Sequence, residues 1–180
     1  MRSSALARRY AGALFETAKD ADLIDQVESD LGLLTFTLES TPRLKETLTH
    51  PLIPPERKKE IVADLLDERV QGVTLHFLDL VIDKRRTEIL EDVEEEYVRL
   101  ANEYRNVMPV MATSAIPLTC DEKSALRKVL EQSTGKTIEL QLEEDPKIIG
   151  GLTIQIGDTV IDGSVRGYLE ALREQLLGQH

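Results

Sequence analysis

Hydrophobic positions recur with two different periods along the chain. From about Ser4 to Arg105 they return every three or four residues, which is the spacing of one face of an α-helix. From Val107 onward, short runs alternate apolar and polar residues between glycines, which is typical of half-buried strands. The pattern predicts a mainly α protein, with an N-terminal six-helix bundle over residues 1–105 and a small α/β domain over residues 106–180.

Proline and turn residues divide the first half into helices. The predicted helices cover about residues 4–19, 24–38, 42–49, 54–66, 70–83 and 89–104. Thr41 is the expected cap of the third helix, with Pro42 at its first position. The inner face of the sixth helix is expected to reach Tyr104. Its acidic residues are interpreted as a solvated side: Glu91, Asp92, Glu94, Glu95 and Glu96.

The second half predicts a sheet of few strands with two helices. Its first strand, over residues 107–112, contains Pro109, which suggests an edge position because proline lacks an N–H. Thr119 and Glu122 form a capping box before a helix that Gly135 ends. Further strands are expected over residues 138–142, 152–156 and 159–161. The last helix carries an apolar stripe: Val165, Leu169, Leu172 and Leu176.

The first and fifth predicted helices carry more apolar residues than one core-facing side needs. One interpretation is a groove between them that receives an amphipathic helix of another protein. The other is a central position in the bundle, where both helices are covered on several sides. Periodicity alone leaves both interpretations open.

Composition and charge narrow the class of protein. Hydrophobic residues make up 41 % of the 180 residues and aromatic residues only 4 %, so the core must be aliphatic, which favours packed helices. The net charge of −11 disfavours binding to nucleic acid or to an anionic membrane surface. The basic clusters at 57–59 and 84–86 lack interleaved aromatic residues, and we interpret them as solvated helix surface.

Cysteine usage and hydropathy bear on the compartment. Cys120 is the only cysteine, so the sequence excludes an intrachain disulfide and a CxxC metal site. The N-terminal residues lack the apolar segment of a secretory signal, and no apolar run approaches the roughly 20 residues that span a bilayer. We therefore expect a protein of a reducing compartment, without direct membrane insertion.

Candidate chemistry is sparse. Gly135-Lys136-Thr137 imitates the end of a phosphate-binding loop, but the glycine required five residues earlier is Leu130. The order of elements is also reversed, since a helix precedes this segment and a strand follows it. None of the histidines has a second ligand at metal spacing, and none is near Cys120. We expect no catalytic residue, no metal site and no cofactor.

Two stretches give the sequence a specific resemblance. Residues 9–18, RYAGALFETA, resemble the first-helix motif of the delta subunit of bacterial-type F-type ATP synthases, the family that includes the mitochondrial oligomycin-sensitivity-conferring protein. Residues 149–167, IGGLTIQIGDTVIDGSVRG, are similar to the C-terminal signature of that family. The order of six helices and a small α/β domain also agrees, so the resemblance covers nearly the whole chain.

The resemblance implies a non-catalytic subunit of the peripheral stalk. Its bundle would receive the N-terminal helix of an alpha subunit between the first and fifth helices, and its C-terminal domain would bind the C-terminus of the b subunit. Some groove residues should then face outward in the free chain, and the small Ala11 would let a visiting helix approach closely. The candidate groove residues are Tyr10, Ala11, Leu14, Phe15, Leu75, Leu78 and Ile82.

The C-terminal signature is interpreted as structural. Gly150-Gly151 suggests a bulge or a close backbone approach, and Gly163 a sharp turn from strand to helix. Asp162 or Ser164 is the expected cap of the last helix. The signature residues are Gly150, Gly151, Gly157, Asp158, Asp162, Gly163, Ser164 and Arg166.

One departure and two alternatives complete the expectations. Gly12 stands in mid-helix, where glycine costs roughly 0.5–1 kcal/mol relative to alanine, so this helix is either looser or closely approached by a neighbour. Without a transit peptide, we expect a bacterial subunit, peripheral on the cytoplasmic face of the cell membrane within the synthase. The alternatives are an unrelated helical adaptor with an appended α/β domain and an enzyme whose site residues are scattered in sequence.

Overall fold

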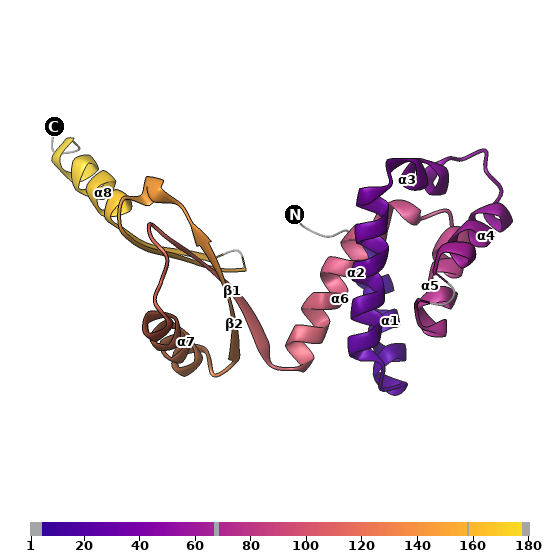
Figure 1. The fold of residues 1–180 in the computed structure, drawn as a ribbon, viewed down its shortest axis with the longest axis horizontal. Helices are drawn as coiled ribbons and strands as arrows, with labels where there is room; N and C mark the ends of the chain where they lie inside the picture. The colour runs from indigo at the N-terminus through magenta and orange to yellow at the C-terminus, as the bar shows by residue number, and fades with distance from the viewer. Residues whose placement is uncertain (1–4, 67–68, 158, 178–180) are drawn as a thin grey trace. The chain divides into compact units, whose positions relative to one another are not determined.

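The computed structural model describes residues 5–66, 69–157 and 159–177 (Figure 1). The chain forms two compact units, Met1–Ala101 and Asn102–His180. The first unit is built from helices and the second from a four-stranded sheet with helices. The predicted fold class, mainly α with a small C-terminal α/β part, is therefore confirmed.

Helices of the first unit follow the predicted order closely. Their bounds are α1 Ala5–Asp20, α2 Ile24–Ser40, α3 Pro42–Thr49, α4 Pro55–Leu66 and α5 Gly72–Asp83, followed by a short 3-10 helix, η1, Thr87–Ile89, and by α6 Leu90–Tyr104. Pro42 occupies the first position of α3 as predicted, but the Thr41 side chain makes no capping hydrogen bond. Asp22 and Arg85 adopt left-handed backbone conformations that end α1 and α5.

The core of this unit is aliphatic, with a few aromatic rings inserted. Val27, Leu31, Val81 and Val93 are fully buried, and the Tyr97 ring lies among them with its hydroxyl donating to the Ile24 carbonyl at 3.2 Å. These residues come from α2, α5 and α6, so the helical period of the sequence selects the buried side of each helix. Such packing explains why a chain poor in aromatic residues folds as a bundle.

Two expectations for α6 are wrong. Tyr104 is 58 % exposed, because α6 continues beyond the core that holds Tyr97. Glu96 is buried rather than solvated, and its carboxylate accepts a hydrogen bond from the Arg99 guanidinium at 2.9 Å. An ion pair one turn apart allows a carboxylate to leave water without losing a charged partner.

The sheet of the second unit has the strand order β2-β1-β3-β4. The strands are β1 Val107–Ser114, β2 Thr137–Glu144, β3 Gly151–Ile156 and β4 Thr159–Ser164. The strand β1 pairs in parallel with β2, whereas the pairs β1–β3 and β3–β4 are antiparallel. The predicted edge position of Pro109 is thus wrong, since β1 lies inside the sheet. However, β3 pairs only with residues 111–114, so one side of β1 has no neighbouring strand at Pro109.

Helices flank this sheet. The helix α7, Cys120–Thr134, begins at the predicted capping box of Thr119 and Glu122 and ends at Gly135, whose φ of 68° is left-handed. A second short 3-10 helix, η2, Pro146–Ile148, precedes β3, and α8, Val165–Leu177, follows β4 (Figure 1). The buried cluster of this unit is small and consists of Val110, Leu130 and Ile138, with partly buried neighbours. Much of its apolar surface therefore stays accessible.

Candidate functional site

The described part of the chain offers little for chemistry. No group of three or more metal-ligating side chains occurs among the described residues. Lys136 follows the left-handed Gly135 and directly precedes β2, so this segment is a helix end and not a phosphate loop. Among the described helices, none is long and apolar enough to cross a bilayer. Exposed apolar surfaces are the candidate sites for protein partners.

The candidate groove between α1 and α5 is mostly filled by the bundle itself. Ala11 is 0 % exposed, and the rings of Tyr10 and Phe77 meet edge to face with centroids 6.3 Å apart. A glutamate at position 11 would therefore disturb the core before it disturbed any partner. Five of the seven candidate residues are buried: Ala11, Leu14, Phe15, Leu78 and Ile82.

Two of the candidate residues remain partly accessible. Tyr10 on α1 and Leu75 on α5 are half-buried. Leu80, which the sequence analysis did not single out, is 46 % exposed on α5. Its exposure agrees with the helical spacing, because it lies one turn after the exposed His76. These three apolar side chains are at least partly accessible on α1 and α5.

The C-terminal signature holds two chain segments in close contact. Gly151 has a φ of 83°, and a side chain on it would overlap the Gly163 carbonyl oxygen. The Gly150 carbonyl accepts a hydrogen bond from Val165 N–H at 2.9 Å. The expected close backbone approach at Gly150-Gly151 is therefore present, and the approaching segment is the one that begins α8.

Asp162 and Ser164 together start α8. The Ser164 hydroxyl accepts a hydrogen bond from Gly167 N–H at 3.0 Å, which makes Ser164 the cap of this helix. Asp162 accepts one from Ser164 N–H at 2.8 Å. Hydrogen bonding from the side chain and the N–H of Ser164 lowers the pKa of the Asp162 carboxyl below its ordinary value. A side chain at Gly167 would overlap this carboxylate, a packing requirement that the sequence analysis missed.

The other signature residues have separate roles. Gly157 has a φ of 55° in the turn between β3 and β4, while Asp158 lies outside the described residues. Gly163 is still in β4 and faces Leu152, so a close strand contact, and not a sharp turn, accounts for it. Arg166 is exposed and pairs with Glu170 at 2.9 Å. None of these contacts forms a catalytic arrangement.

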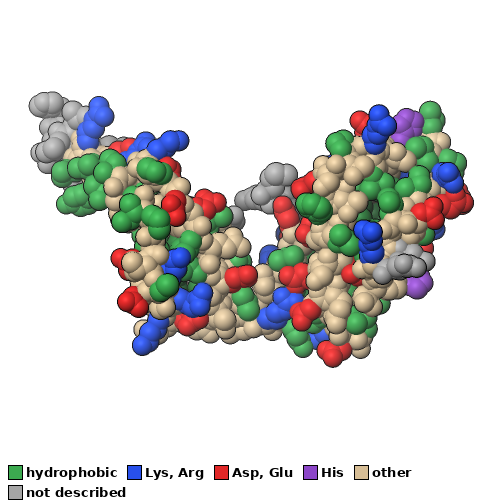
Figure 2. Space-filling view, viewed as in Figure 1, with side chains coloured by type: hydrophobic (Ala, Val, Ile, Leu, Met, Phe, Trp, Pro, Cys, Tyr) green, Lys and Arg blue, Asp and Glu red, His purple; other side chains and the backbone are tan. Residues whose placement is uncertain are grey.

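An exposed apolar surface covers α8. Tyr168 is 71 % exposed and Leu169 50 % exposed, and Figure 2 shows apolar side chains gathered over α8. The described members of the predicted stripe, Val165, Leu169 and Leu172, therefore do not form a core face, and the side chain of Leu176 lies outside the described residues. We name this surface the α8 patch; its described members are Val165, Tyr168, Leu169 and Leu172. An exposed apolar patch of this kind is a candidate interaction site.

A second feature of this unit is a strained loop beside a hollow. Ile149 has a φ of 68° and a ψ of −42°, and Gly150 N–H bonds to the Ile148 carbonyl at 2.8 Å, which closes a strained three-residue turn. A β-branched residue such as isoleucine seldom adopts a positive φ. The Ile149 side chain is also 66 % exposed. It lines a pocket of about 590 Å³ together with Ile116, Leu118 and Leu126.

Comparison with known proteins decides the family. The family model described as "ATP synthase delta (OSCP) subunit" matches residues 6–176. The chain belongs to this family. Since the match spans both units, the alternative of an unrelated helical adaptor is set aside.

Full-length relatives and a solved structure agree with this membership. The chain is 39 % identical over 176 residues to "ATP synthase subunit delta" of Desulforudis audaxviator, with 98 % of this chain and 97 % of the relative covered. It is 35 % identical to the protein of the same name from Bacillus licheniformis, over 100 % and 98 % of the two chains. A chain of the Toxoplasma gondii mitochondrial ATP synthase hexamer shares the fold, with a TM-score of 0.71 at 20 % identity over 97 % and 98 % of the chains.

Proposed function

We propose that the chain is a non-catalytic subunit of the peripheral stalk of an F-type ATP synthase. In this role it links the alpha subunits of the catalytic head to the b subunits, so that the head is held still during ion-driven ATP synthesis. Membership in the delta family supports the assignment to the complex. The proposed place is the cytoplasmic face of the bacterial cell membrane, where the chain is peripheral.

The α8 patch is the single observation that carries the linking role. Its apolar side chains extend along one helix of a unit whose own core is small. A stalk protein that ends in an amphipathic helix would bury such a surface. On this ground we assign residues 106–180 to binding the C-terminus of the b subunit.

The bundle is assigned to the head. Residues 1–105 contain the α1–α5 surface, where Tyr10, Leu75 and Leu80 are at least partly accessible. The N-terminal helix of an alpha subunit would lie across these side chains, and the buried candidates, Ala11 among them, would support the surface from below. This arrangement keeps the groove hypothesis but moves its contacts to the outer residues.

Co-purification tests the proposal. A tagged chain expressed in a bacterium should retain both alpha and b subunits from a membrane extract. Tyr168→Glu should lose b but keep alpha, because it places a charge on the α8 patch without touching the bundle. Phe36→Glu is the matched control, since Phe36 is 67 % exposed on α2 and also aromatic.

The outcomes separate the parts of the proposal. Failure of the unaltered chain to retain either subunit would reject the stator role. Retention of b by Tyr168→Glu at the level of the control would remove the b site from α8 while leaving the role itself intact.

A further inference from the structure

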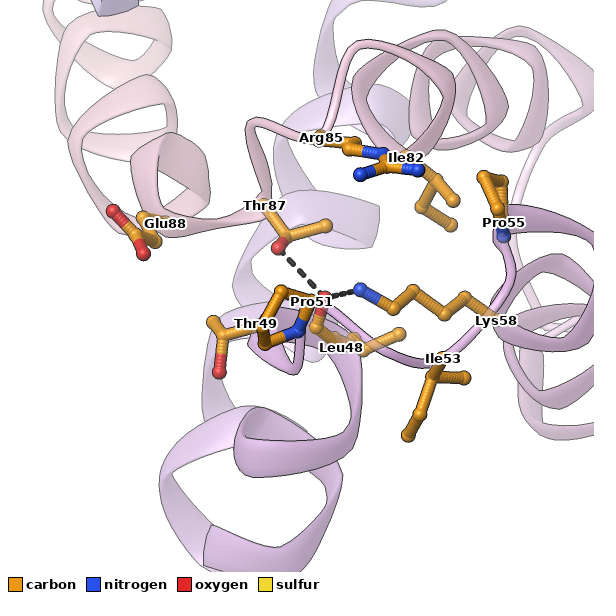
Figure 3. Close-up of a pocket in the computed structure, with 10 residues that line it drawn as sticks. All are labelled: Leu48, Thr49, Pro51, Ile53, Pro55, Lys58, Ile82, Arg85, Thr87 and Glu88. Carbon is orange, nitrogen blue, oxygen red and sulfur yellow. Dashed lines mark hydrogen bonds between the residues drawn. The ribbon is translucent and has the colours of Figure 1, made fainter.

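Lys58 is a buried cation that the sequence analysis placed on a solvated surface. Its side chain is only 6 % exposed, in the first turns of α4. The ammonium donates a hydrogen bond of 2.6 Å to the Leu48 carbonyl at the end of α3, and that carbonyl also accepts from the Thr87 hydroxyl at 3.0 Å (Figure 3). A neutral carbonyl satisfies one of three N–H donors and leaves the charge unbalanced.

Arg85 adds a second positive charge to the same pocket. It stands in the turn after α5 with a left-handed φ of 54°, and its side chain lines the cavity that Lys58 enters (Figure 3). Burial, and then the nearby Arg85 charge, lower the pKa of the Lys58 ammonium. Two cations that repel each other in a partly buried site are an arrangement that a bound anion would relieve.

Within the described residues, no carboxylate pairs with either cation. Glu88 is the only acidic residue among those that line the pocket there, and Figure 3 shows its carboxylate directed away from the Lys58 ammonium. The chain as a whole carries a net charge of −11, so a local excess of positive charge stands out against its surroundings. The charges that line the pocket therefore favour an anion over a cation.

The cavity is large enough for a small oxyanion. Its volume is about 210 Å³, below the roughly 300 Å³ at which pockets for drug-sized ligands begin. The guanidinium fork of Arg85 and the spare ammonium donors of Lys58 suit the oxygens of a tetrahedral oxyanion. We infer that the pocket between α3, α4 and the α5–η1 turn binds a phosphate-class oxyanion. The inference is independent of the stator role.

Binding and unfolding measurements on the full chain test this site. Inorganic phosphate should bind saturably, measured by the ³¹P line width, and should raise the unfolding temperature above that in chloride of equal ionic strength. Arg85→Gln should weaken phosphate binding at least about tenfold, since it removes a charged donor. Arg86→Gln is the matched control, because it removes the same charge from the adjacent exposed residue, which does not line the pocket.

The two variants and the chloride comparison distinguish a specific phosphate site from a general effect of charge or salt. Phosphate binding that survives in Arg86→Gln and is lost in Arg85→Gln supports the site. Equal loss in both variants, or stabilisation by phosphate no greater than by chloride, overturns it, because the effect is then one of general charge or salt. Competition by glycerol phosphate at equal concentration would identify a phosphoryl group on a larger molecule as the ligand, whereas its failure to compete would identify the free ion.

Discussion

The Thr74 hydroxyl on α5 donates a hydrogen bond of 2.7 Å to the Asp30 carboxylate on α2. The same carboxylate oxygen accepts from Gln71 N–H at 2.7 Å, and Asp30 is only 6 % exposed. Gln71, the residue before α5, makes no side-chain cap of its own. A carboxylate from another helix thus serves as the cap of α5 and favours the positive end of its dipole.

Replacing Asp30 should destabilise the bundle. Asp30→Ala leaves the buried Thr74 hydroxyl and the partly buried Gln71 N–H without their acceptor, so the free energy of unfolding should fall by about 2–4 kcal/mol. Asp30→Asn keeps an acceptor but loses the charge, and should cost about 1–2 kcal/mol. Urea unfolding followed at 222 nm measures both. Glu39→Ala, on the exposed end of α2, should change stability by less than about 0.5 kcal/mol, and an equal effect at both positions would contradict the capping role.

Two glycine-to-alanine changes should have opposite signs. A Cβ at Gly12 meets no atom within 4 Å, so Gly12→Ala should stabilise α1 by about 0.5–1 kcal/mol. Gly151→Ala should destabilise the second unit by about 2 kcal/mol or more, because its φ is positive and the Gly163 carbonyl occupies the space. Scanning calorimetry of the full chain provides the comparison. A destabilised Gly12→Ala would show that the free chain needs this glycine.

The strain at Ile149 predicts a stabilising substitution. Ile149→Gly should raise the free energy of unfolding by about 0.5–1 kcal/mol, the relieved strain minus the extra backbone entropy of glycine. Ile148→Gly, the same change at the preceding half-buried residue of η2, should lower it. If both variants lose stability equally, the positive φ stores no strain.

Acid should weaken the start of α8 through Asp162. Because the folded pKa lies below the unfolded value of about 3.9, the contribution of this carboxylate is present above that value and lost as pH falls through the folded pKa. Asp162→Asn should therefore lower stability at pH 7 and have less effect near about pH 3. Urea midpoints at the two pH values give the measurement, with exposed Glu143→Gln on β2 as the control. If Asp162→Asn lowered stability by the same amount at both pH values, the contribution of Asp162 would come from its hydrogen bonds and not from its charge.

The sequence predicts the helices well because their burial is periodic. Leu31 and Tyr97 are buried where the helical spacing requires. The capping box at Thr119 and the left-handed Gly135 are likewise local signals that no distant contact overrides. Local chemistry thus sets element bounds to within a few residues.

Contacts between distant segments could not be predicted in the same way. Lys58 stands in a run of basic residues, and its burial depends on a carbonyl ten positions away on another helix. The stripe on α8 has the spacing of a core face, yet Leu169 stays half exposed among the described residues of its unit. The hydrophobic period shows which side of a helix is suited to burial. It does not show whether the chain itself or a partner covers that side.

The junction between β4 and α8 has a mechanical consequence. Ser164 ends β4 and Val165 begins α8, so no loop separates the strand from the helix. Tension applied to α8 by a bound partner would therefore act directly on the hydrogen bonds between β3 and β4. In a stator under repeated torque, this junction would be stiff, and the six residue pairs between β3 and β4 would share the applied force.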